Sequence, residues 1–154
     1  LEFRRVLFRS ADMPVRGIAT SGRHGRSFSL GIADAVTVLA RTASQADAAA
    51  TVIANAVDLP GHPAIMRVPA NELQPDSDLG GRLVTRDVEN LAEHEIGQAL
   101  EAGAARARML LMSGLIEGAA LRLLGETRLV GATGIGAPKS HAFQERTIEH
   151  MLQA

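Results

Sequence analysis

The pattern of apolar and polar positions along the chain predicts short strands and two longer helices. Residues 15–22 have the pattern of a short apolar strand that ends in a Ser-Gly turn. Residues 25–40 continue as extended chain, and the β-branched residues near the end of this segment indicate a strand to about residue 40. Residues 64–70 predict another short strand, and residues 118–132 predict a hairpin that turns near Gly125.

The first helix has its start indicated twice. Thr42 is followed three residues later by Gln45, which fits a capping box, and Ser44 with Asp47 fits the related Ser-x-x-acid pattern. The Pro and Gly that come soon after Val57 predict that the helix ends near that residue.

A second helical pattern covers residues 91–113, with Gly103 in its middle, so the segment is either one helix or two. Residues 71–81 form a polar stretch rich in turn residues and predict a loop. For residues 134–154 we expect a loop followed by a short helix.

Strands and helices in this order favour an α+β fold with a mainly antiparallel sheet packed with helices, because a doubly wound sheet needs regular alternation. A chain of 154 residues, 46% of them apolar, suits one domain with a sizeable core. No segment approaches the ~20 apolar residues of a membrane span. The chain has no cysteine, which excludes a disulfide framework, so a cytoplasmic setting is the default.

The first ten residues, LEFRRVLFRS, do not match the Ala- and Gly-rich composition that follows. We expect residues 1–10 to be an artefact derived from a sequencing adapter translated in frame, and residues 11–154 to form the domain, truncated at its N-terminus. The alternative is a short basic lead, but no apolar signal segment follows it.

Without this decapeptide the chain has 13 basic and 16 acidic residues instead of 16 and 17, and its formal charge changes from −1 to −3. No basic stripe remains and aromatic residues are few, so a nucleic-acid partner is not expected. The oligomeric state is not indicated by the sequence.

Asp47 and Thr51 lie four residues apart, so on a helix they share one face, one turn from each other. A carboxylate and a hydroxyl so placed supply two of the oxygen ligands that Mg²⁺ or Ca²⁺ prefers. The alternative is that Asp47 caps the helix from its first turn, where the helix dipole favours a carboxylate. On pattern alone, capping ranks ahead of metal binding.

The turn TSGRHGRS, residues 20–27, combines hydroxyls, glycines and arginines, and such a turn can hold phosphate through backbone N–H groups and arginine side chains. A solvated hairpin turn is an equal alternative. His24 could act as an acid, a base or a ligand, although a single histidine in an arginine-rich turn is more often simply exposed. The remaining histidines lack metal-type spacing.

Several motifs together resemble a known family. The segments IATSG and ADAVTVLARTASQADAAAT, with IAN inside the first helix and a later GLIEGA, occur in the order found in an uncharacterised family of ApbE-like proteins. These proteins are similar to the C-terminal core of ApbE, the FAD:protein FMN transferase, and the likeness covers most of residues 17–131. It implies an ApbE-like, T-fold-related core.

The resemblance also implies a site. In the transferases an Asp and a Thr of the helix motif bind the Mg²⁺ at the FAD pyrophosphate, and they match Asp47 and Thr51 here. The Thr-Ser-Gly turn matches Thr20, Ser21 and Gly22. The resemblance therefore implies Mg²⁺ and FAD, or another phosphorylated small molecule, as cofactor and ligand, and it raises metal binding above capping for Asp47.

Two parts of the transferase pattern are missing. The transferases carry a His-x-Ile-Asp-Pro motif between the Thr-Ser-Gly turn and the next strand, and RHGRSFSLGI stands there instead. The N-terminal part that contacts much of the flavin is also missing. No catalytic residue can therefore be assigned, and the chain is expected either to carry flavin-transferase-type activity or to be a non-catalytic binding or scaffold module that keeps the fold.

Overall fold

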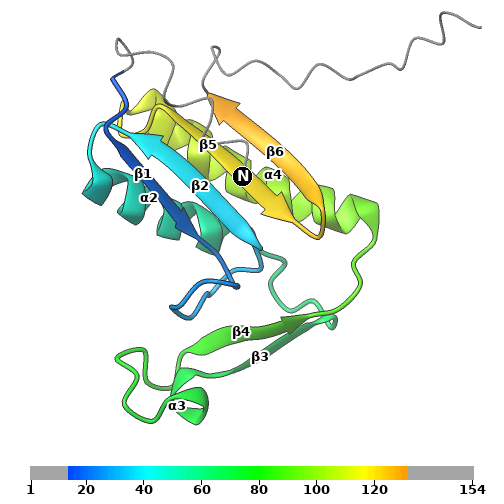
Figure 1. Ribbon diagram of the computed structural model, residues 1–154. Coiled ribbons are helices and arrows are strands. Elements are labelled where there is room, and N and C mark those ends of the chain that lie inside the picture. The colour runs from blue at the N-terminus through cyan, green and yellow to red at the C-terminus, as the bar shows by residue number, and fades with distance from the viewer. Residues whose placement is uncertain (1–13, 132–154) are drawn as a thin grey trace, which may run out of the picture.

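The computed structural model describes residues 14–131 (Figure 1). The described strands are β1 (Gly17–Ser21), β2 (Ala35–Ala40), β3 (Ile65–Pro69), β4 (Leu83–Val88), β5 (Gly118–Leu123) and β6 (Glu126–Gly131). The described helices are α2 (Ala43–Ala56), α3 (Ala70–Leu73) and α4 (Glu93–Met112).

Two layers form the larger part of the molecule, which we call the body. One layer is an antiparallel sheet with the order β1-β2-β5-β6. The other layer consists of α2, which packs against β1 and β2, and α4, which packs against β5 and β6 and also contacts α2 (Figure 1). The predicted α+β fold with a mainly antiparallel sheet is confirmed.

The N-terminus of α2 confirms one of its two predicted start signals. The Thr42 hydroxyl accepts the N–H of Gln45 at 3.2 Å, so Thr42 is the N-cap. The second signal is wrong, because no acidic residue lies in the first turn of the helix. Asp47 lies in the following turn, where it neither caps the helix nor gains the full benefit of the helix dipole. The helix ends at the predicted place, with Val57 as its C-cap.

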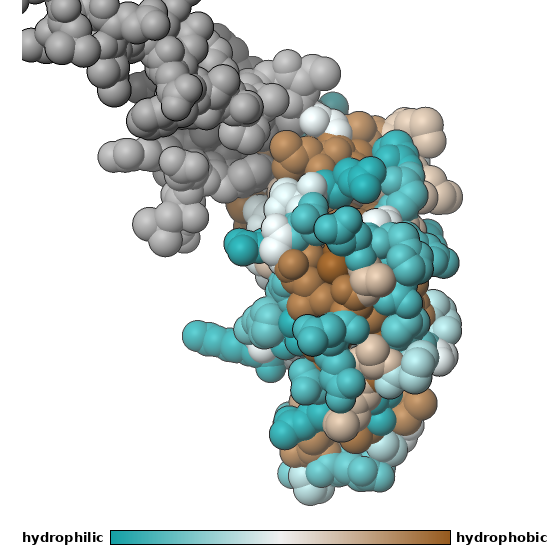
Figure 2. Space-filling view, turned by 90° about the vertical axis from the view of Figure 1, so that its right-hand side faces the viewer, coloured by the Kyte–Doolittle hydropathy of each residue, from teal (hydrophilic) through white to brown (hydrophobic). Residues whose placement is uncertain are grey.

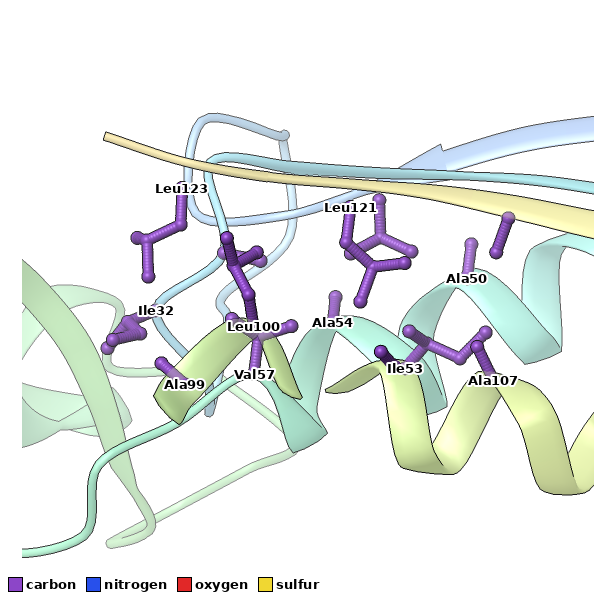
Figure 3. Close-up of a cluster of buried hydrophobic side chains, with 14 of the residues drawn as sticks. Ile32, Ala50, Ile53, Ala54, Val57, Ala99, Leu100, Ala107, Leu121 and Leu123 are labelled. Carbon is purple, nitrogen blue, oxygen red and sulfur yellow. The ribbon is translucent and has the colours of Figure 1, made fainter. Parts of the chain in front are cut away.

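Small side chains bring the two layers close together. Figure 3 shows Ala50, Ile53 and Ala54 of α2, Leu100 of α4 and Leu121 of β5 in the layer between the helices and the sheet. All five are almost completely buried. Because alanine fills little space, the helices lie near the sheet and near each other, and the core depends on fit more than on bulk.

Gly103 lies inside α4, which is one unbroken helix. A Cβ at this position would lie 2.3 Å from Val57 Cγ2 and 2.8 Å from Leu121 Cδ2, closer than real carbon contacts. The glycine therefore serves close packing against α2 and β5, and the helix passes through it without a break.

A separate two-stranded ribbon, which we call the hairpin arm, consists of β3, α3 and β4 and projects from the body (Figure 1). The strand predicted over residues 64–70 is confirmed as β3. The expected loop over residues 71–81 is partly wrong, since α3 occupies its first residues. The hairpin predicted near the end of the chain is confirmed as β5 and β6, with its turn at Leu124 and Gly125.

The extended chain expected before residue 35 is also wrong in part. Residues 22–34 form turns and bends, and only Ala35–Ala40 is a strand. The reason is tertiary, because Asp34 accepts hydrogen bonds from Arg23 and Leu124, and a Cβ on Gly31 would lie 2.2 Å from the carbonyl oxygen of Ala54, so contacts outside any ladder hold this segment. The predicted loop and helix of residues 134–154 lie outside the described residues. No helix within residues 14–131 is long and apolar enough to cross a membrane.

Candidate functional site

Asp47 and Thr51 lie one turn apart on the exposed surface of α2. At 100° per residue they occupy the flank of the helix opposite to Gln45 and Val52, which face α4. Among the residues that the structure describes, the Asp47 carboxylate has no hydrogen-bond or ion-pair partner. Thr42 caps the helix, so Asp47 does not have the capping role that the sequence suggested for it.

The three residues of the Thr-Ser-Gly turn do not share one side of the sheet. Ser21 pairs in register with Val36, which is buried beneath the helices, so the Ser21 side chain lies on the helix side. Thr20 pairs with Thr37, and their hydroxyls are 2.8 Å apart on the opposite face. Ser21 is therefore the hydroxyl of the turn that lies on the same side as α2.

Strand β1 and helix α2 run in the same direction from a shared starting point. A Cβ on Gly17 would lie 2.1 Å from the carbonyl oxygen of Thr42, so both elements begin together. Ser21 lies about 13 Å along β1, at roughly 3.3 Å per residue. Thr51 lies about 13 Å along α2 from Thr42, at roughly 1.5 Å per residue. Ser21 is therefore level with Thr51 along this direction and is offset from Asp47 by about one helical turn along it.

Gly22 ends β1 in a conformation that excludes other residues. Its φ is +152°, and a Cβ would lie 2.5 Å from the carbonyl oxygen of Asp34. The Arg23 N–H then donates to the carbonyl of Ala33 at 2.9 Å, which closes the turn. The backbone of the turn is thus held firmly, while residues 24–27 are exposed.

Asp34 organises this end of the sheet, although the sequence analysis did not single it out. Its Oδ1 accepts from Arg23 Nε at 2.8 Å and lies 3.3 Å from His24 Nε2. Its Oδ2 accepts the N–H of Leu124 at 2.6 Å. Leu124 has a φ of +46°, unusual for a residue with a side chain, so the carboxylate supports the strained turn between β5 and β6.

The pairing with Asp34 changes what the arginines of the turn can do. The Arg23 guanidinium is mostly buried against Asp34 and is 3.9 Å from Asp87 of the hairpin arm. It therefore has carboxylate partners already. Arg26 is exposed and has no ion pair within residues 14–131, so it is the arginine of the turn available to an anion. The side chain of His24 is 65% exposed.

A second histidine contact lies where the hairpin arm leaves the body. His62 Nε2 is 2.8 Å from Glu95 Oε1, and His62 Nδ1 accepts the N–H of Ala64 at 3.2 Å. Glu95 Oε2 accepts the N–H of Ala92 at 2.7 Å. The Ala92 N–H, followed by the His62 ring, lowers the pKa of Glu95 from its ordinary value. Because both groups have structural partners, this pair holds α4 and β3 together.

No group of three or more His, Asp or Glu side chains within the described range could hold a metal ion. A cation at Asp47 and Thr51 would therefore need other oxygens, such as those of a phosphate, a backbone carbonyl or water. A hollow of about 300 Å³ lies at the other edge of the sheet, where Glu93, Glu126 and Arg128 mix opposite charges. The side of the molecule with β6 shows only separated hydrophobic patches among hydrophilic residues (Figure 2).

Comparison with known proteins gives one family and one relative. The model of a family described as "AbpE bacteria" matches residues 2–129 of the chain. A UPF0280 protein of Methanopyrus kandleri is 62% identical over 42 residues, which are 27% of this chain and 17% of the relative's length. No solved structure matches the chain. The T-fold-related core and the domain boundary at residue 10 therefore stay predictions.

Proposed function

Because the chain belongs to the AbpE bacteria family, we propose that it binds a phosphorylated nucleotide, with FAD as the first candidate, together with Mg²⁺ held by Asp47 and Thr51. The observation that carries the proposal is the state of Asp47. It is an exposed carboxylate without a partner in the described part of the chain, one turn from a hydroxyl.

The side chains present suit this cation. A carboxylate and a hydroxyl are hard oxygen donors, and Mg²⁺ is commonly bound by one or two carboxylates plus the phosphates of a ligand and water. When bound, the ion neutralises phosphate charge and acts as a Lewis acid toward a phosphoryl oxygen. Alanines on either side of Asp47 leave space for a ligand to approach.

The turn after β1 supplies the other contacts in this proposal. The Ser21 hydroxyl and the backbone at Gly22 orient the phosphate, since both lie at the end of β1 level with Thr51. Thr20 is part of the same turn, and its hydroxyl is engaged with Thr37 on the opposite face, where it stabilises β1 against β2. Arg26 adds a positive charge at the exposed part of the turn.

Isothermal titration calorimetry of the purified protein with Mg²⁺ and FAD tests the proposal. Asp47→Asn keeps the shape of the side chain and removes its charge, and it should weaken Mg²⁺-dependent binding about tenfold or more, as loss of even an indirect metal contact does elsewhere. Asp76→Asn, at an exposed acid of the hairpin arm, is the matched control and should leave binding unchanged. Equal affinity for the wild type and Asp47→Asn would refute the role of Asp47.

Flavin-transferase-type activity is the finer form of this proposal, and a binding or scaffold module without catalysis is the second candidate. The second candidate is favoured by the segment between β1 and β2, which has no His-x-Ile-Asp-Pro sequence and in which Asp34 is committed to Arg23 and Leu124. Incubating the protein with FAD, Mg²⁺ and cell extract separates the two. If flavin becomes covalently attached to a polypeptide and this attachment depends on Mg²⁺, the scaffold module is excluded. If no polypeptide is labelled, the transferase is excluded.

We also propose a cytoplasmic location, since a chain without cysteine needs no oxidising compartment. A fluorescent fusion expressed in the native host would report this location directly.

A further inference from the structure

A second concave site lies on the helix side of the molecule, between α2 and the C-terminal end of α4 with the loop after it. We call it the α2–α4 groove, and its volume is about 190 Å³. The residues that line it are Gln45, Ala48, Ala49, Val52, Leu110 and Leu115. None of these side chains carries a charge, so the groove does not suit an ion or a phosphorylated molecule, which would lose its hydration there without gaining a charged partner.

Two alanines give the groove its depth. The lining residues of α2 follow the spacing i, i+3, i+4 and i+7, so they share one side of the helix. Because alanine side chains are short, this row is lowest at Ala48 and Ala49, while Val52 and Leu115 stand higher and are each 45% exposed. An apolar cavity of about 150 Å³ in another protein holds one benzene molecule, so this groove has room for one small ring system.

Gln45 supplies the polar side chain of the lining. Its Oε1 is buried and has no hydrogen-bond partner, the one such side-chain atom among the residues that the structure describes. A buried acceptor without a donor is costly. The backbone of Gln45 is fixed, since its N–H donates to the Thr42 hydroxyl at the cap of α2. The terminal amide can still turn about its last torsion, which lets the oxygen meet a donor placed in the groove.

These features define the kind of molecule that fits. Sites for small molecules commonly combine a mainly apolar lining with a few polar groups that fix the orientation of the ligand. We propose that the α2–α4 groove binds a small, uncharged, flat ring system that carries one N–H or O–H donor, and that Gln45 Oε1 accepts the hydrogen bond from this donor. The apolar lining removes the faces of the ring from water.

This site is separate from the proposed nucleotide site. Asp47 and Thr51 lie on the other flank of α2 from Gln45 and Val52, so a ring in the groove contacts neither of them. Asp47→Asn should therefore leave the affinity for such a ring unchanged. The two proposals can fail independently, because each depends on a different set of side chains.

Indole and benzofuran are matched probes for the groove, because they have nearly the same shape and only indole carries an N–H. In two-dimensional NMR spectra of the full chain, indole should shift the amide signals of residues 45–52 and 110–115 until the site is saturated. Indole should bind about three- to tenfold more tightly than benzofuran, the effect expected of one hydrogen bond. Equal affinities for the two probes, or no saturable shifts in these segments, would overturn the proposal.

Two variants test the acceptor and the shape separately. Gln45→Met keeps the length of the side chain and removes the acceptor, so it should bring both probes to equal affinity. Ala48→Leu fills the low part of the groove and should abolish the binding of both probes. Ala105→Leu, at an exposed alanine of α4 outside the groove, is the matched control and should leave both affinities unchanged. A preference for indole that persists in Gln45→Met, or equal effects of the two leucine variants, would overturn the proposal.

Discussion

The body and the hairpin arm are stabilised by different kinds of interaction. In the body, α2 and α4 bury one face of a four-stranded sheet, and the core between them consists of apolar side chains. In the arm, two strands alone cannot enclose a core, since an isolated hairpin is marginally stable. Ile65 and Val88 at its base join the core of the body, but Val84 and Ala70 farther out do not.

Polar contacts therefore position the arm. The Arg67 guanidinium forms an ion pair with Asp58 and donates to the carbonyl of Leu30, both of the body. The N–H of Thr85 donates to the carbonyl of Ser29 at 2.8 Å, in the segment between β1 and β2. The body is therefore specified by packing, whereas the orientation of the arm depends on a few hydrogen bonds and ion pairs.

Truncating a core side chain should have the largest effect. Leu121→Ala removes a fully buried side chain of β5 that contacts both helices, and it should lower the free energy of unfolding by about 2–5 kcal/mol. Chemical denaturation followed by circular dichroism measures the change. Leu129→Ala, at a side chain 51% exposed on β6, should cost far less. Equal losses in the two variants would contradict a core centred between the helices and β5.

Removing an arm contact should have a smaller and more local effect. Arg67→Met keeps much of the side-chain volume but leaves Asp58 and the Leu30 carbonyl without their partner, which should cost about 1–3 kcal/mol for a pair that is only partly exposed. Hydrogen–deuterium exchange should speed up in β3 and β4 and not in β2 or β5.

The control for this experiment is Arg82→Met, at an exposed arginine of the arm that has no ion pair within residues 14–131. It should leave exchange unchanged. If Arg67→Met destabilised the body as much as the arm, the two regions would form one cooperative unit and the contrast between them would be lost.

The smallest effect is expected from the joint between the arm and α4, and it depends on pH. The pKa of Glu95 is lower in the folded protein than its ordinary value of about 4.5, because Ala92 and His62 donate to the carboxylate. Its contribution to stability is therefore complete above about pH 4.5 and is lost as the pH falls through the lower folded pKa. Melting temperatures of the wild type and Glu95→Gln should differ at pH 6 to 7, and the difference should shrink as the solution is acidified.

Glu93→Gln is the matched control, at an exposed carboxylate in the same turn of α4 that has no hydrogen bond in the described structure. It should show no comparable pH dependence. A difference between wild type and Glu95→Gln that grew on acidification would mean that the sign assigned to the pKa shift is wrong.

Local signals in the sequence were enough to predict most elements of the body. Thr42 caps α2 as the spacing to Gln45 indicated, because a capping hydrogen bond involves only neighbouring residues. The turn at Gly125 and the apolar strands around it were recognised for the same reason. Strand β4 was not predicted, since half of its sequence LVTRDV is polar and its place depends on contacts with Ser29, Leu30 and β3.

The same distinction between local and tertiary signals applies to the candidate site. The sequence determined that Asp47 and Thr51 share a helix flank, because a spacing of four residues fixes this on any α-helix. Of the two start signals that the sequence offered, the cap at Thr42 is the one used, and it places Asp47 beyond the first turn. The sequence could not determine that Ser21 lies on the helix side and Thr20 on the opposite face, since both follow from the register of β1 against β2.

By itself, the sequence determined the positions of most helices, strands and turns of the body, because these depend on residues that are close together along the chain. The tertiary structure decided the rest. Gly103 is a packing residue only because Val57 and Leu121 lie against it, and Asp34 is important only because Leu124, 90 residues later, donates to its carboxylate. Contacts between residues so far apart leave no local signal in one sequence, and they exist only once packing has brought the elements together.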